Sequence, residues 1–185
     1  FTSLSSLGMN PILVNQIIKN KKKNNHETII NAYYFRLTFS LFNYLIFIFL
    51  INILNKNQIY LNYSLIIGIG IIFKSCEVFF SYFEAKSLSK YIVISQLVGL
   101  ISSAIIVFYV INKNLDYIYI YYALILDIIL VFILINTFYY LKISTFFIRI
   151  NLLVLKNIIL KSFPVLISSL SIILYMRIDQ IMINA

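Results

Sequence analysis

The chain has 185 residues, of which 62% are hydrophobic and only 11% are charged, and its formal net charge is +9. A soluble domain of this size has too much surface to hide so much apolar material, so the composition excludes an ordinary soluble protein. Several apolar segments reach the roughly 20 residues that a helix needs to cross a bilayer. We therefore predict an all-α polytopic membrane protein, built as a transmembrane helix bundle. The single cysteine, Cys76, excludes an internal disulfide and a cysteine-based metal site.

Residues 1–18 are apolar but are interrupted by Gly8 and Pro11. This pattern predicts the tail of a membrane span followed by a kinked or interfacial helix. A run of lysines comes next, and on its own it would suit nucleic acid or anionic lipid. Beside a membrane span, the excess of Lys and Arg in cytoplasmic loops is the better explanation. His26 lies in the same loop without a second His or Cys nearby, which disfavours a metal-ligand role.

The first complete span is predicted at residues 31–54, with Arg36 only about five residues inside it. A long cationic side chain at that depth can reach the membrane surface, so Arg36 is interpreted as snorkelling. The next span is predicted at residues 59–83 and contains Gly68 and Gly70. No strand and no third glycine accompany this Gly-Ile-Gly, so close helix packing is favoured over nucleotide binding.

Lys74 and Glu77 follow in the same span, three positions apart. Side chains at this spacing are neighbours on a helix, so the two charges can partly neutralise each other. Two interpretations stay open here: a self-satisfied pair near the cytoplasmic end of the span, and part of a substrate site.

Spans are also predicted at residues 91–111 and 117–141. Tyrosines cluster at both ends of the second of these, which is typical of interfacial aromatic belts, although sugar stacking is an alternative. Asp127 lies about ten residues into that span, roughly 15 Å deep and near the midplane. It has no basic residue three or four positions away, so its partner is expected on another element. The tyrosines are Tyr117, Tyr119, Tyr121, Tyr122, Tyr139 and Tyr140.

Residues 142–161 carry four cations among apolar residues, a pattern that suits a surface-lying amphipathic linker.

The last span is predicted at residues 163–183, with Pro164 near its start, where a missing N–H does little harm. Serines in its first half can bond back to their own backbone. Arg177 and Asp179 lie well inside and about 200° apart round the helix, so each needs a partner on another helix.

The distribution of Lys and Arg among the loops predicts the topology. Ten lie in the loops after the first, third and fifth segments, and two lie in the alternate loops, which places the first group in the cytoplasm. The net positive charge is thereby explained without nucleic acid. The ten are Lys19, Lys21, Lys22, Lys23, Lys86, Lys90, Lys142, Arg149, Lys156 and Lys161, and the two are Lys56 and Lys113.

Three stretches resemble a known family. The sequence Ser-Phe-Pro-Val-Leu-Ile-Ser-Ser-Leu at 162–170, followed by Tyr-Met-Arg-Ile-Asp-Gln-Ile-Met at 175–182, is similar to the start of the seventh helix of polysaccharide (O-antigen type) flippases. These belong to the multidrug/oligosaccharidyl-lipid/polysaccharide exporter superfamily. Residues 7–16 resemble the end of that family's second helix, and residues 73–91 resemble the turn between its fourth and fifth helices.

The resemblance implies two six-helix lobes around a central cavity, and translocation of an undecaprenyl-diphosphate-linked oligosaccharide by alternating access across the bacterial cytoplasmic membrane. The chain is interpreted as a fragment, because it starts without Met and stops just after a charged intramembrane motif. Residues 1–141 would form the N-terminal lobe, 142–161 the cytoplasmic linker, and 162–185 the first helix of the C-terminal lobe. Membrane lipid and the polysaccharide polymerase and chain-length machinery are the further partners expected.

The sequence contains no phosphate-cradling loop, metal-ligand spacing or nucleophile–base set, so we predict a transporter without a cofactor, driven by an ion gradient or a partner. In the flippases that this chain resembles, cationic groups attract the anionic substrate. Three residues match that requirement in charge: Arg36, Lys74 and Arg177. We hypothesise that Arg177 contacts diphosphate or acidic sugar while an acid couples a proton or sodium. The acidic candidates are Asp127, Asp179 and Glu77.

Two alternatives remain open. A multidrug or cation antiporter of the same superfamily would use intramembrane acids to bind cationic drugs, and a mostly acidic cavity would favour it. A non-transporting scaffold of polysaccharide assembly would keep its activity when every buried charge is neutralised.

Overall fold

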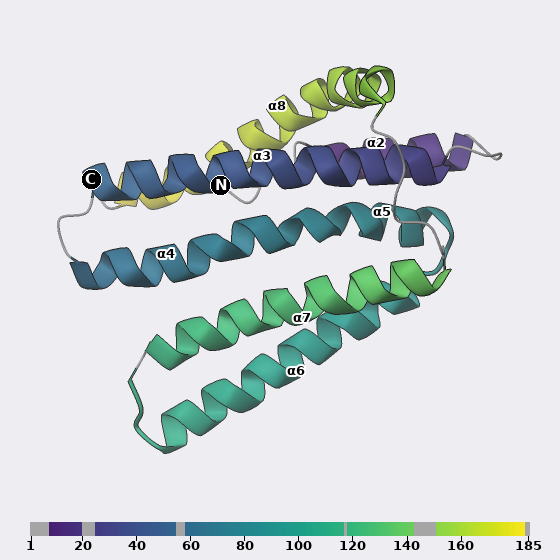
Figure 1. Cartoon of the computed structure of the whole chain (residues 1–185). Helices are drawn as coiled ribbons and strands as arrows, with labels where there is room; N and C mark the ends of the chain where they lie inside the picture. Colours follow the sequence, from purple (N-terminus) through teal and green to yellow (C-terminus); the bar gives the residue numbers. More distant parts are fainter. Residues whose placement is uncertain (1–7, 20–24, 55–57, 117, 143–150, 184–185) are drawn as a thin grey trace.

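In the computed structural model, the described residues are 8–19, 25–54, 58–116, 118–142 and 151–183, and every regular element in them is a helix. The prediction of an all-α fold is confirmed (Figure 1). The elements are α2 (Met9–Lys19), α3 (Asn25–Leu54), α4 (Gln58–Phe73), the 3₁₀ turn η1 (Lys74–Glu77), α5 (Val78–Ala85), α6 (Lys90–Asn112), α7 (Ile118–Lys142) and α8 (Leu152–Ile183).

Five stretches of these helices are long and apolar enough to cross a membrane, so the chain is a multi-pass membrane protein. The first span begins six residues before the predicted one, the next three agree with the prediction to within four residues at each end, and the fifth begins eight residues before the predicted one. They are Asn25–Ile53, Tyr63–Ala85, Lys90–Asn112, Ile118–Lys142 and Leu155–Ile172.

The helices form a bundle in which the α4–η1–α5 span lies between α3 and α7 (Figure 1). Helix α6 packs along α7 as a hairpin, while α2 and α8 pack against α3. Lys90 and Lys142 both lie over the ring of Tyr91, at 5.2 and 5.6 Å from its centroid, so α6 begins where α7 ends. At the other end, Tyr63 of α4 stacks on Tyr121 of α7 with centroids 4.7 Å apart. Two of the ten cations that were counted as cytoplasmic, Lys90 and Lys142, therefore lie at the same end of the bundle.

An aromatic core fills the bundle at the end where α6 begins and α7 ends. The ring of Tyr139 lies 4.4 Å from Phe79 and 5.2 Å from Tyr82, centroid to centroid. Tyr139 is fully buried, so the interfacial-belt interpretation is wrong for this tyrosine, although Tyr140 is exposed. The reason is helical phase: Tyr139 lies four positions after the buried Ile135, on the face of α7 that packs inward.

The paired glycines of α4 are packing positions, as predicted. A Cβ on Gly68 would lie 2.6 Å from Phe47 of α3, and a Cβ on Gly70 would lie 2.7 Å from Ile128 of α7. A real Cβ does not fit at such distances, so the absence of side chains lets α4 approach a helix on each side.

Helix α8 differs from the prediction at Pro164. The proline lies inside α8 and not near its start, because the predicted linker residues from 152 onward continue into the same helix. Its missing N–H removes one helical hydrogen bond there. Lys156 and Lys161 are exposed while Leu155 and Ile158 are buried, which confirms the amphipathic pattern. Farther along α8, Ser169 donates to the carbonyl of Leu166 at 2.8 Å and Ser171 to that of Ile167 at 3.0 Å, as predicted.

Candidate functional site

The site is built around a break in the second span. Four residues, Lys74 to Glu77, form a 3₁₀ turn between α4 and α5. A 3₁₀ turn has three residues per turn, so side chains at i and i+3 eclipse, and Lys74 and Glu77 leave the helix on the same side. Between them, Ser75 and Cys76 are buried in the bundle. A short 3₁₀ stretch in mid-helix is typical of a functional position.

Arg36 of α3 lies in the interior at 0% exposure. Its Nη2 donates to Oε2 of Glu77 at 2.6 Å, and its Nη1 donates to Oδ1 of Asn10 at 3.0 Å. Its Nε has no hydrogen-bond partner among the residues that the structure describes. The snorkelling interpretation of Arg36 is therefore wrong. Because α2 and the α5 region pack over this part of α3, the guanidinium is sealed inside and compensated by Glu77.

This pairing contradicts one of the two interpretations of Lys74 and Glu77, and the other, a substrate site, stays a prediction. The carboxylate of Glu77 is held by Arg36, and Lys74 has no ion pair within the described part of the chain, so a self-satisfied pair is wrong. The side chain of Glu77 is 29% exposed, so it contacts the buried Arg36 on one side and borders an open space beside η1 on the other.

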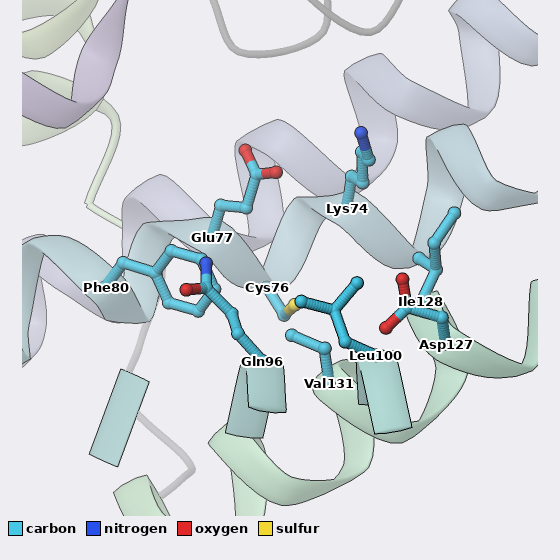
Figure 2. A pocket seen from close by; sticks show the side chains of 9 residues that line it. All are labelled: Lys74, Cys76, Glu77, Phe80, Gln96, Leu100, Asp127, Ile128 and Val131. Atoms are coloured by element: carbon cyan, nitrogen blue, oxygen red, sulfur yellow. The ribbon is translucent and has the colours of Figure 1, made fainter. Parts of the chain in front are cut away.

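That space is a cavity of 290 Å³ (Figure 2). Three of the predicted candidates lie on its wall together: Lys74 and Glu77 come from η1, and Asp127 comes from α7. Gln96, which the sequence analysis did not identify, adds an amide from α6 and is exposed. The residues that line the cavity are Lys74, Cys76, Glu77, Phe80, Gln96, Leu100, Asp127, Ile128 and Val131.

Asp127 reaches the cavity because α6 has a glycine opposite to it. A Cβ on Gly99 would overlap Oδ1 of Asp127 and would lie 3.1 Å from its backbone oxygen. Gly99 is buried, as are Ser95 and Ser103, one turn before it and one turn after it on the same face. This small-x-x-x-small spacing is the sequence signal that could have identified the face of α6 against which Asp127 packs.

The charges near the cavity balance. Arg36 compensates Glu77, and Lys74 lies on the same wall as Asp127, as Figure 2 shows. In a low-dielectric interior, uncompensated charges are costly, whereas a neutral set of donors and acceptors can persist and bind a polar ligand.

The remaining candidates, Arg177 and Asp179, lie on α8, but their side chains are outside the described residues. Their roles therefore stay predictions. Elsewhere on the same helix, Ser168, Ile172 and Tyr175 are exposed.

Comparison with known protein families matches residues 1–185 to the family described as polysaccharide biosynthesis protein. No curated protein and no solved structure matches the chain.

Proposed function

Because the chain belongs to the polysaccharide biosynthesis protein family, we propose that it translocates undecaprenyl-diphosphate-linked oligosaccharide repeat units across the bacterial cytoplasmic membrane. The observation that carries this proposal is the partly open cavity between η1, α6 and α7, where Lys74, Glu77, Gln96 and Asp127 meet among apolar spans. Polar side chains are costly in such a setting, and they typically mark a substrate or ion pathway.

In the proposed mechanism, the described lobe and a second lobe alternate in opening the pathway to either side of the membrane. Lys74 offers an ammonium donor to the substrate, because it is the cation that lines the cavity in the described part of the chain. Arg177 contacts the substrate from α8, and Asp127 or Asp179 couples the step to a proton or sodium gradient. Arg36 contributes by fixing Glu77, since its guanidinium already has two partners in the interior.

A cation antiporter is the second candidate, and the two carboxylates on the cavity wall favour it. Their charges are matched by Arg36 and Lys74, however, so the wall does not carry the negative excess that cationic drugs require.

The test is deletion of the gene in its own host, with measurement of surface polysaccharide and of lipid-linked repeat units on each side of the membrane. We expect repeat units to accumulate on the cytoplasmic side and wild-type plasmid to reverse this. Proteoliposomes holding the intact protein should then move a fluorescent lipid-linked oligosaccharide between leaflets. Normal surface polysaccharide in the deletion strain together with raised drug sensitivity would contradict the proposal and favour the antiporter.

A scaffold makes a different prediction in the same strain. Plasmids carrying Lys74→Gln, Glu77→Gln and Asp127→Asn together would restore polysaccharide fully if the protein only organises its partners. We expect this triple variant to fail although it is present in the membrane, which immunoblotting of membrane fractions checks.

A further inference from the structure

The cavity brings together the side-chain types that bind sugars. Glu77 and Asp127 offer carboxylate acceptors, Lys74 offers an ammonium donor, and the Gln96 amide offers both a donor and an acceptor. Phe80 adds an aromatic ring to the same wall, near Gln96 in Figure 2. We propose that this cavity binds one sugar ring of the transported oligosaccharide, an inference that rests on the proposed function and assigns a substrate group to its site.

The size of the cavity fits a sugar ring. A water molecule occupies about 30 Å³ in the liquid, so 290 Å³ has room for about ten water-sized groups. A pyranose ring with its hydroxyl groups has about that many non-hydrogen atoms. An undecaprenyl chain is far too large for this space, and a bare ion would leave most of it filled with water.

The chemistry also favours a neutral hydroxylated ligand. Each sugar hydroxyl donates one hydrogen bond and accepts others, so it can donate to Asp127 or Glu77 while it accepts from Lys74 or Gln96. Apolar side chains, among them Leu100 and Val131, complete the wall and suit the C–H faces of a ring. Because the charged groups already balance, a neutral ring binds without bringing an uncompensated charge into the interior.

A metal or alkali ion fits less well. Such ions need several oxygen ligands at roughly 2.3–2.6 Å, which requires the carboxylates to converge on one point. In the described part of the chain, no group of three His, Cys, Asp or Glu side chains is placed to hold a metal ion. The ammonium of Lys74 on the same wall also repels a cation. Asp127 therefore binds the sugar and not a metal ion, and of the two acids proposed for coupling, Asp179 is the one left for sodium.

Gln96 gives a direct probe, because it is exposed and lines the cavity. In the intact protein with its native cysteines replaced, Gln96→Cys is labelled with N-ethylmaleimide in nanodiscs. The probe ligand is the soluble repeat oligosaccharide released by mild acid from the host's own surface polysaccharide. We expect this oligosaccharide to slow labelling at least about threefold, equally in sodium chloride and in choline chloride.

Variants of α7 test whether Asp127 on the cavity wall contributes to oligosaccharide binding. Asp127→Ala should raise the oligosaccharide concentration that halves the labelling rate by about ten- to one hundredfold. This is the change in affinity expected when one charge-assisted hydrogen bond is lost. Asp127→Asn keeps an acceptor and a donor, so it should stay within about fivefold of the parent. Asn136→Ala is the matched control, because Asn136 lies on the same helix, donates to the Phe132 carbonyl at 2.7 Å and does not line the cavity.

Several outcomes would overturn the sugar site: sodium chloride protects and oligosaccharide does not, undecaprenyl diphosphate without sugar protects equally well, or nothing protects. The translocation assay is read separately. Protection by oligosaccharide without translocation would leave the sugar site standing and remove the proposed function. Translocation without protection by oligosaccharide would leave the proposed function standing and remove the sugar site.

Discussion

Removing the carboxylate of Glu77 should destabilise the fold strongly. Glu77→Ala leaves the Arg36 guanidinium, which is 0% exposed, with Asn10 as its remaining partner among the described residues. Breaking a buried pair by removing one partner costs about 3–5 kcal/mol, because the other charge stays buried without compensation. For a chain of this size, 1 kcal/mol shifts the melting temperature by about 2–4 °C, so we expect a loss of about 6–20 °C.

The double variant Arg36→Met/Glu77→Leu is the decisive comparison. It removes both charges and refills the space with apolar groups, which is often neutral in a buried setting. We expect it to be at least about 2 kcal/mol more stable than Glu77→Ala, as measured by thermal unfolding of the purified intact protein followed by size-exclusion chromatography. Two results would refute the argument from burial. Either Glu77→Ala is as stable as the double variant, or the losses of stability caused by Arg36→Met alone and by Glu77→Leu alone add up to the loss in the double variant, which would mean that the two residues are not coupled.

Three further changes test other parts of the structure. Gly99→Ala should cost about 1–3 kcal/mol by overpacking against Asp127 and should reduce translocation in the proteoliposome assay, whereas Ser102→Ala, on the adjacent face, should do neither. Lys74→Gln should lower translocation at least about tenfold but change stability by less than about 1 kcal/mol, since Lys74 has no ion pair with any described residue. A stability loss large enough to explain the lost translocation would contradict this. Ile101→Lys, on the exposed face of α6, should cost about 3–4 kcal/mol of insertion free energy in a glycosylation-mapped insertion assay, and unchanged insertion would argue that this face does not meet lipid.

Much of the fold could be predicted from the sequence, because the bilayer fixes the length of each span and hydropathy reports it directly. The predicted packing roles of Gly68 and Gly70 are confirmed for a similar reason: a residue without a side chain inside an apolar helix has few other uses. Helix ends were harder to place. Pro164 was expected near the start of a helix, but the chain before it is amphipathic enough to be helical as well.

The candidate site was only partly predictable. The charged residues could be identified because ionisable groups are rare in spans, yet their partners depend on which helices become neighbours, and no local pattern encodes that. Arg36 and Glu77 are 41 positions apart, so local spacing instead favoured the pair Lys74 and Glu77. Gln96 was missed because a lone amide in an apolar run has no distinctive spacing.

Helix α3 connects the cavity wall to the beginning of α8. Near its start, Asn31 accepts a hydrogen bond from the backbone N–H of Asn151 at 3.0 Å, and Glu27 accepts one from the Asn151 side chain at 3.2 Å. Five residues after Asn31, the same helix presents Arg36 to Glu77. At about 1.5 Å per residue, the two attachments are only about 7.5 Å apart along α3. Because an α-helix is stiff over such a length, the residue that precedes α8 and the carboxylate of the cavity wall are held by one rigid element. The buried ion pair thus fixes the position of the cavity wall relative to α8, a role that neither Arg36 nor Glu77 would have as an exposed charge.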